Sequence, residues 1–319
     1  MHYFLWETWG VADNLPTELK KLFKFYIEQR NNPPEAFTHA AGLISSPSFF
    51  TVAKLQQHLG NPLLSPNWVQ LHFNGEMIPL DTHTLWKTVQ GRDLQFIDKE
   101  IVEDCIHRGG ALVLEGIDIL EPAINAFMQK VDASMPCALS NCVAFFSQKG
   151  NEAYAGHRDS DDVLVIQLSG EKLWHIFKPQ QRRYFNNTSL TRTQMGEQLA
   201  EVVMRPGDAL FMPAGVPHIV KTIGDHSLHL AFDLIDRTPN VESMNEAACN
   251  RYNNGSENPH VPPSKVIDHY IRILQSPGFQ QEIAGMTEQT RTAAAQFRER
   301  IGRASVSRAL SKFIPREQK

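Results

Sequence analysis

The chain has 319 residues, 42% of them hydrophobic and 21% charged, with a formal net charge of -4, which is the composition of an ordinary globular protein. A balance so close to neutrality gives no general reason to expect binding to nucleic acid or to a membrane. No apolar run reaches the roughly 20 residues that span a bilayer. The first residues lack the basic and apolar segments of a signal peptide, so none is expected.

The cysteines form neither a CxxC pair nor the spacing of a zinc site. We therefore expect reduced thiols in a cytoplasmic protein. The four residues are Cys105, Cys137, Cys142 and Cys249.

Residues 1–138 are expected to form an N-terminal cover of helices and outer strands. The signals are apolar residues at helical spacing, Thr51 as an N-cap, and an Asn74-Gly75 turn between alternating apolar residues. The elements expected in chain order are helices at 15–30 and 47–62, a hairpin at 67–80, a helix followed by a strand at 98–118, and a helix at 120–135.

Residues 139–238 change to short β-forming runs separated by Gly, Pro, Asp and Asn, which predicts an antiparallel sandwich or barrel. Residues 239–319 return to helical spacing. The strand-forming runs are 141–148, 163–177, 201–215, 217–223 and 226–234, and the helical ones are 264–279 and 287–313.

A histidine and three aspartates stand directly before the run at 163–177. Since alternate residues of a strand share a face, His157 projects together with Asp159 and Asp161. An imidazole and a carboxylate side by side can hold two positions around a metal ion. A second histidine would complete the 2-His-1-carboxylate face that suits Fe(II). Spacing alone does not choose between Asp159 and Asp161.

His218 is the candidate for the second histidine. It ends the stretch 205–218, in which a Pro-Gly-Asp turn, an apolar strand and a Pro/Gly-rich turn follow one another. Chain reversal can bring it into the cavity of His157, although it could also be an ordinary turn residue on the surface. Other candidates remain at His175, His226 and His229.

Lys172 lies in an otherwise apolar run that we interpret as a hairpin with Ser169-Gly170-Glu171 at its turn. It would share a face with Trp174 and Ile176. A buried lysine is costly unless it has an anionic partner, which a dicarboxylate would supply. The alternative is a lysine at a hairpin end whose amine reaches water.

Together, His157-x-Asp159, Lys172 and the stretch ending at His218 resemble the JmjC/cupin-type 2-oxoglutarate and Fe(II)-dependent oxygenases, in particular the ribosomal-oxygenase-like cupins that hydroxylate protein side chains. The resemblance is most specific over residues 139–236. It implies a double-stranded β-helix, the cupin/JmjC jelly roll, between the N-terminal α/β cover and the C-terminal helical region.

The resemblance also implies roles for individual residues. His157, Asp159 and His218 would hold iron, Lys172 would pair with the far carboxylate of 2-oxoglutarate, and Asn141 would line the pocket for oxygen and cosubstrate. This choice of Asp159 leaves Asp161 as a rim residue.

Asp233 departs from the family, whose members usually carry a small or neutral polar residue there. Because a carboxylate would repel the cosubstrate, Asp233 either faces elsewhere or meets a cationic group of the substrate. Further residues expected around the cosubstrate or substrate are Trp174, His229, Tyr154 and Asp161.

The implied reaction is hydroxylation of an amino-acid side chain in a protein or peptide, with Fe(II), molecular oxygen and decarboxylation of 2-oxoglutarate to succinate. The same site could demethylate an N-methyl group. Alternatives are the same chemistry on a free amino acid or small biosynthetic intermediate, and a metal cupin that is not an oxygenase. A peptide-binding module without activity would not need converging metal ligands.

The C-terminal helices resemble a dimerisation region and predict a possible homodimer. Their last thirty residues are rich in arginine, which would fit an acidic or ribonucleoprotein partner. A solvated helix face is the simpler interpretation. The basic residues are Arg291, Arg298, Arg300, Arg303, Arg308, Lys312, Arg316 and Lys319.

Overall fold

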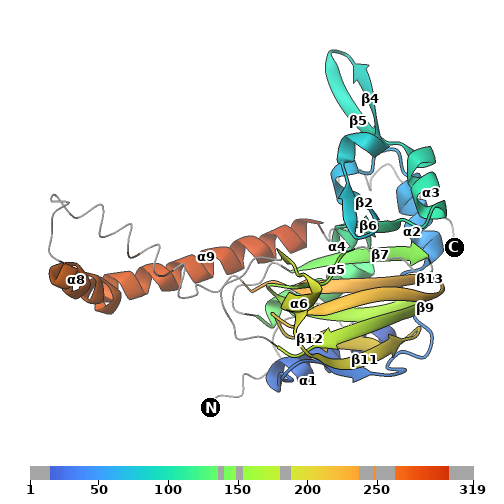
Figure 1. Cartoon of the computed structure of the whole chain (residues 1–319). Helices are drawn as coiled ribbons and strands as arrows, with labels where there is room; N and C mark the ends of the chain where they lie inside the picture. The colour runs from blue at the N-terminus through green and yellow to red at the C-terminus, as the bar shows by residue number, and fades with distance from the viewer. Residues whose placement is uncertain are drawn as a thin grey trace, which may run out of the picture.

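The computed structural model describes residues 15–135, 140–148, 154–179, 188–236, 244, 248 and 263–301 (Figure 1). A sheet-based body has parts of the N-terminal cover at its upper and lower ends in this view, and a long C-terminal helix projects from it. The elements of the cover are α1 (Thr17–Asn31), β1 (Thr38–Ala40), α2 (Val52–Gly60), a 3₁₀ turn (Pro66–Trp68), β2 (Val69–Phe73), β3 (Glu76–Ile78), a 3₁₀ turn (Leu80–His83), β4 (Thr84–Val89), β5 (Arg92–Ile97), α3 (Lys99–His107), β6 (Ala111–Leu114), α4 (Ile117–Leu120) and α5 (Pro122–Ala133).

The remaining elements supply most of the sheet and the C-terminal helices. They are β7 (Asn141–Gln148), β8 (His157–Arg158), β9 (Asp162–Phe177), β10 (Thr188–Ser189), α6 (Arg192–Met195), β11 (Gln198–Met204), β12 (Ala209–Met212), β13 (His218–Leu234), α8 (Pro263–Gln275) and α9 (Pro277–Ile301).

The structure confirms the predicted helix cap at Thr51 and the predicted turn at Asn74-Gly75. The Thr51 side chain accepts a hydrogen bond from the Lys54 amide at 3.3 Å and so caps α2. Asn74 and Gly75 have φ values of 54° and 80°, as a type I′ turn between β2 and β3 requires. The β4–β5 hairpin was not predicted, and Figure 1 shows it projecting from the cover.

Among the described residues, eleven strands form one antiparallel sheet built around β9 and β13. The first half of β9 pairs with β12, and its second half pairs with β11. The sheet continues from β13 through β7 and β6 to β2 and β3, so strands of the cover extend it. The predicted mainly β fold with helical additions is confirmed.

The predicted hairpin at Ser169-Gly170-Glu171 is wrong, because β9 runs unbroken through these residues. Gly170 has φ 65°, and it bends the strand without reversing it. β13 bends with it, since the pairing of the two strands shifts register between Thr222 and Ser227. The Ser-Gly sequence therefore marks a bulge, which a turn signal alone does not distinguish from a hairpin.

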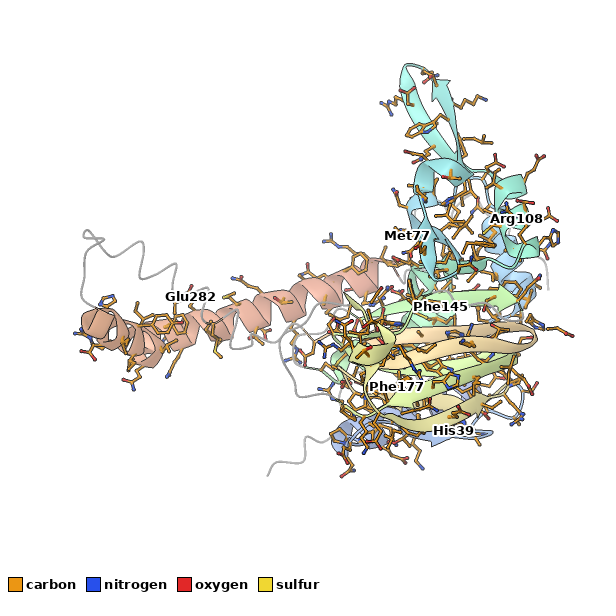
Figure 2. All side chains as sticks on the ribbon, viewed as in Figure 1. His39, Met77, Arg108, Phe145, Phe177 and Glu282 are labelled. Atoms are coloured by element: carbon orange, nitrogen blue, oxygen red, sulfur yellow. The ribbon has the colours of Figure 1, made fainter. Side chains whose placement is uncertain are left out.

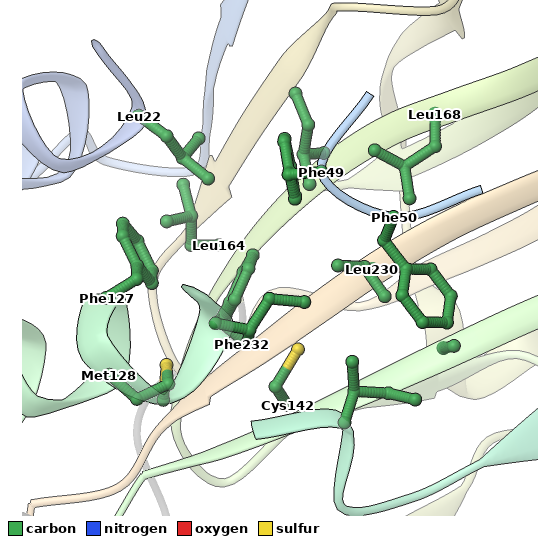
Figure 3. Packing of buried hydrophobic residues seen from close by; sticks show 14 of the residues in the cluster. Leu22, Phe49, Phe50, Phe127, Met128, Cys142, Leu164, Leu168, Leu230 and Phe232 are labelled. Carbon is green, nitrogen blue, oxygen red and sulfur yellow. The ribbon is translucent and has the colours of Figure 1, made fainter. Parts of the chain in front are cut away.

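Alternation along the strands divides the apolar residues between two cores. Leu164, Ile166 and Phe232 belong to the larger core, which packs against helix residues such as Phe127 and Met128 (Figure 3). Their strand neighbours face the smaller core inside the bend of the sheet, which contains Val163, Val165, Trp174, Ile176, Val202, Met204, Leu210, Met212 and Ala231. Several side chains on this inner face of the sheet also line the cavity described below.

The C-terminal helices confirm the predicted helical pattern as far as residue 301, and the basic residues from 303 onward lie outside the described residues. Figure 2 shows Phe145 and Phe177 on the strands, Met77 and Arg108 on the cover, and Glu282 far out along α9. Cys105 and Cys142 are buried free thiols, whereas Cys137 and Cys249 lie outside the described residues. Among the described helices, none combines the length and apolar character that a membrane span requires.

The shared bend predicts that Gly170→Ala destabilises the fold. A Cβ atom there would clash with the carbonyl oxygen of His226, and Gly170 has a positive φ as well. We expect a loss of about 2 kcal/mol or more in the free energy of unfolding, measured by urea denaturation. Gly42→Ala is the matched control, because Gly42 has φ 60° but open space around its Cβ position. Equal effects of the two variants would contradict the packed bend.

Candidate active site

The three predicted metal ligands meet at one end of the sheet. His157 lies on β8, Asp159 follows it, and His218 is the first residue of β13 and pairs directly with His157. One donor atom from each lies within 4.8 Å of the others. Since two ligands at about 2.1 Å from one ion are at most about 4.2 Å apart, small side-chain movements suffice to close the group on an ion.

Hydrogen bonds orient the imidazole rings of His157 and His218 so that both could bind one metal ion. His157 Nδ1 lies 2.9 Å from the carbonyl oxygen of Ala155, and His218 Nδ1 lies 3.1 Å from that of Val216. A carbonyl can only accept, so each Nδ1 carries the proton and each Nε2 presents its lone pair. The Nε2 atoms lie 3.6 and 3.7 Å from the Asp159 carboxylate oxygens.

Burial also keeps His218 in the neutral, ligating form. Its side chain is 3% exposed, and burial, followed by the neighbouring His157, lowers the pKa of His218 to about 4. The donor set of two neutral imidazoles and one carboxylate suits Fe(II) and related divalent metals.

The other candidate histidines do not join this group. His175 pairs with Glu201 at 3.1 Å, and His226 with the Ser169 hydroxyl at 2.7 Å near the bend. His229 belongs to no group of potential metal ligands in the described part of the chain. It does line the cavity that contains His157, Asp159 and His218, which we call the metal-ligand group.

A cavity of about 390 Å³ extends from the metal-ligand group into the bend of the sheet. Five more of the predicted residues line it: Asn141, Tyr154, Lys172, Trp174 and His229. Asp233 lines it as well, so this carboxylate does not face elsewhere. Asp161 is not among the lining residues, and its carboxylate accepts a hydrogen bond from the Ser160 hydroxyl at 3.0 Å.

Lys172 brings a buried ammonium group into the cavity. Its residue is 2% exposed, which excludes the alternative of an amine in water. Nζ donates to the Ser147 hydroxyl at 2.6 Å and to the Thr222 hydroxyl at 2.9 Å. Both hydroxyls orient the ammonium group inside the cavity, where a buried positive charge favours an anionic ligand.

Aromatic side chains pack around the space between Lys172 and the metal-ligand group. Trp174 stacks on His218 at 5.4 Å, and His229 stacks on Phe145 at 4.9 Å between ring centroids. Burial, then the charge of Lys172, lowers the pKa of His229 well below its usual value. Within the described structure, Trp174 Nε1 and His229 Nδ1 are buried without a hydrogen-bond partner, so a polar molecule in the cavity would find two open nitrogen atoms.

Carboxylates gather on another side of the cavity. Asp233 pairs with Asn141 across the sheet, and Glu115, just after β6, lines the same wall. Burial, followed by the charges of Asp159, Asp161 and Glu115, raises the pKa of Asp233 to about 7. A nearby cation would favour the charged form of this group.

Sequence reasoning missed Glu115, Ser147 and Thr222. Ser147 shares the inward face of β7 with Asn141, and Thr222 shares that of β13 with His218, so alternation could have identified both. Glu115 had no such signal, because it reaches the cavity through the pairing of β6 with β7.

The fold and the site define a curved antiparallel barrel of the cupin type, with a 2-His-1-carboxylate group and a buried lysine in one cavity. The model of the JmjC domain family matches residues 119–244. The resemblance found in the sequence is thereby confirmed, because this part of the chain is similar to JmjC domains and to a ribosomal oxygenase.

Similar proteins agree with this assignment. Ribosomal oxygenase 1 of Gallus gallus is 30% identical over 105 residues, which are 31% of this chain and 18% of that protein. The bifunctional lysine-specific demethylase and histidyl-hydroxylase NO66 of Aedes aegypti is 28% identical over 98 residues, 29% of this chain and 15% of that protein. The matched part is thus less than a fifth of either relative.

The solved structure of Escherichia coli YcfD has the same fold. It superposes with a TM-score of 0.54 at 15% identity, over 82% of this chain and 70% of that chain. A structure of the ribosomal oxygenase YcfD with cobalt and 2-oxoglutarate gives a TM-score of 0.52 at 14% identity, over 82% of this chain and 70% of that chain.

The two neighbouring aspartates give a direct test of the metal-ligand group. Asp159→Ala should weaken Mn(II) binding at least about tenfold, since it removes one of three ligands. Asp161→Ala should change it less than about twofold, because surface substitutions away from a site have small effects. The measurement is titration followed by electron paramagnetic resonance of free Mn(II). Equal losses in the two variants would reject the assignment of Asp159.

Proposed function

We propose that the chain is an Fe(II)- and 2-oxoglutarate-dependent oxygenase that hydroxylates an amino-acid side chain in a protein or peptide. The observation that carries this proposal is Lys172, a buried ammonium group in the cavity that contains the 2-His-1-carboxylate group. A metal cupin of another class would need the ligand group but not this lysine.

Each part of the cavity has a task in this reaction. His157, Asp159 and His218 would hold Fe(II), which with 2-oxoglutarate and oxygen supplies the oxidation of a C–H bond and releases succinate and carbon dioxide. Lys172 would hold the far carboxylate of 2-oxoglutarate and fix its orientation. The packing of Trp174 against His218 would limit the access of water.

The relatives favour a protein or peptide over a small metabolite as the substrate. Two of them are named as a ribosomal oxygenase and as a lysine-specific demethylase and histidyl-hydroxylase. The acidic wall formed by Asp233 and Glu115 supports a cationic group at the target residue. We therefore propose an arginine, lysine or histidine side chain as the group that enters the cavity, with the same chemistry on a free amino acid as the second candidate.

The division of the chain and its assembly are further proposals, which keep the expectations drawn from the sequence. We propose a cover (1–138), a catalytic core (139–238) and a C-terminal helical region (239–319) that forms a homodimer. Exposed apolar residues on α8 support the homodimer, since Ile267 is 58% and Ile271 44% exposed one helical turn apart.

Succinate release tests the reaction itself. With Fe(II), ascorbate and 2-oxoglutarate, the parent protein should form succinate above buffer. Lys172→Ala should raise the KM for 2-oxoglutarate at least about tenfold because it removes a buried ionic contact. Its Mn(II) affinity should stay unchanged, and the exposed Lys221→Ala is the control. Unchanged 2-oxoglutarate affinity in Lys172→Ala would show that this lysine does not bind the cosubstrate.

A peptide panel tests the cationic substrate. Peptides with a central arginine, lysine or histidine should raise succinate formation more than the matched norleucine peptide. Asp233→Asn should raise the KM for the best of them about tenfold, because it removes a buried charge opposite the cation, and should leave the KM for 2-oxoglutarate unchanged. Asp225→Asn, on the exposed part of β13, is the control. Preference for the norleucine peptide would exclude a cationic target.

A further inference from the structure

Arg298, near the C-terminal end of α9, is buried inside the body of the protein. It is 2% exposed, although the sequence groups it with basic residues on a solvated helix face, so that interpretation is wrong for this residue. Its neighbours Arg291 and Arg300 are exposed, as predicted. A guanidinium group this deeply buried is stable only when its donors and its charge are satisfied.

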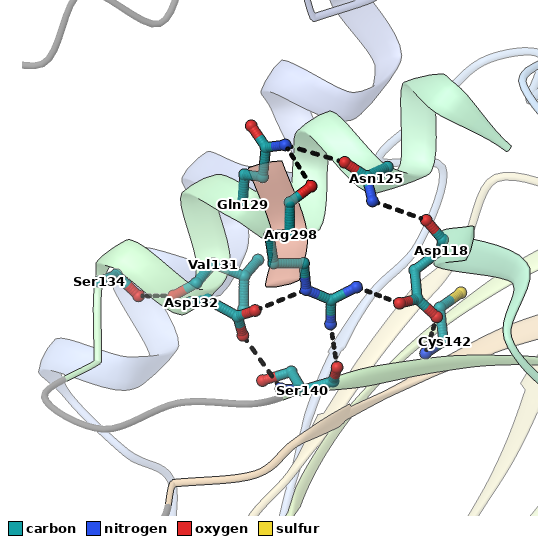
Figure 4. A network of polar contacts seen from close by, with 9 residues as sticks. All are labelled: Asp118, Asn125, Gln129, Val131, Asp132, Ser134, Ser140, Cys142 and Arg298. Carbon is teal, nitrogen blue, oxygen red and sulfur yellow. Dashed lines mark hydrogen bonds and ion pairs between the residues drawn. The ribbon is translucent and has the colours of Figure 1, made fainter. Parts of the chain in front are cut away.

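Three nitrogen atoms of Arg298 each have their own acceptor (Figure 4). Nη1 donates to the Asp118 carboxylate, Nη2 donates to the carbonyl oxygen of Ser140, and Nε donates to Asp132 at 2.8 Å. Gln129 adds a hydrogen bond to the Arg298 carbonyl oxygen at 3.3 Å. Burial opposes the charge of Arg298, but the two carboxylates outweigh it and raise its pKa.

The same carboxylates also hold the start of β7. Asp132 accepts a hydrogen bond from the Ser140 amide, and Asp118 accepts one from the Cys142 amide, both at 3.1 Å. Together with the Arg298–Ser140 contact, these bonds fix the backbone on both sides of Asn141. Asn141 lines the cavity and lies opposite Asp233 in the sheet.

We propose that Arg298 is a positioning residue, through which the seating of α9 fixes the Asn141–Asp233 wall of the cavity. The wall's role in binding substrate rests on the function proposed above. Without Arg298, the buried carboxylates of Asp118 and Asp132 lose the positive charge that both contact, and they repel each other. The carbonyl oxygen of Ser140 also loses the hydrogen bond from Arg298. The start of β7 then moves away from its position, and the cationic target loses its partner.

The effect should be local to one end of β7. In this proposal Asn141, which the family resemblance places at the cosubstrate pocket, acts instead with Asp233 on the substrate side of the cavity. Lys172 is held by Ser147, at the other end of β7, and by Thr222 on β13, so the cosubstrate end keeps its geometry. A loss of global stability alone would affect both ends alike. The position of Arg298 on α9 thus makes the C-terminal helices able to control substrate binding without changing cosubstrate binding.

The test compares Arg298→Met with Arg300→Met in the full chain. Arg298→Met should speed hydrogen exchange at the Ser140 and Cys142 amides about tenfold or more. It should also raise the KM for the best peptide of the panel at least about fivefold while changing that for 2-oxoglutarate less than about twofold. Arg298→Lys should restore part of the effect, and Arg300→Met should change neither quantity.

A second variant covers the case in which Arg298→Met fails to fold. The triple variant Arg298→Met, Asp118→Asn, Asp132→Asn removes all three buried charges, and such neutral replacements are often tolerated. It should fold and still show the high peptide KM. If Arg298→Met or the triple variant folds and shows the parent's hydrogen-exchange rates at Ser140 and Cys142 and the parent's peptide KM, the proposal is overturned. If the parent made no succinate with any peptide, the proposed function would fail, while exchange at Ser140 and Cys142 would still decide whether Arg298 positions β7.

Discussion

The pairing of β9 with β13 across a shared bend is the interaction on which the site depends. Both strands pass the bend unbroken, with Gly170 on one and the register shift after Thr222 on the other. Because they bend together, Lys172 and Trp174 on the second half of β9 line the same cavity as His229 on the second half of β13. His218 begins one end of β13, and Asp233 lies near its other end, yet both line the same cavity.

Much of this arrangement could be predicted because it follows from period-two alternation and local turn signals. His157-x-Asp159 and the strand ending before His218 were located from such patterns, and the structure brings them together. The choice among several histidines and aspartates needed the family resemblance, because spacing does not show which strands become neighbours. The mistaken hairpin at Gly170 has the same origin: a glycine with positive φ suits a turn and a bulge equally.

What the sequence could not show depends on contacts between distant segments. Glu115 reaches the cavity only because β6 extends the sheet beside β7. Arg298 looks like any other arginine of a basic helix, and its burial depends on Asp118 and Asp132, more than 160 residues earlier. In both cases a charged residue is placed by tertiary packing that overrides the general tendency of such residues to lie in water.

The central claim is that one cavity binds a metal ion and, through Lys172, a dicarboxylate. A crystal structure with Mn(II) and 2-oxoglutarate tests it most directly. We predict an anomalous scattering peak bound by His157 Nε2, Asp159 and His218 Nε2, and a 2-oxoglutarate carboxylate within hydrogen-bonding distance of Lys172 Nζ. A peak at other residues, or a cosubstrate whose far carboxylate avoids Lys172, would contradict the account.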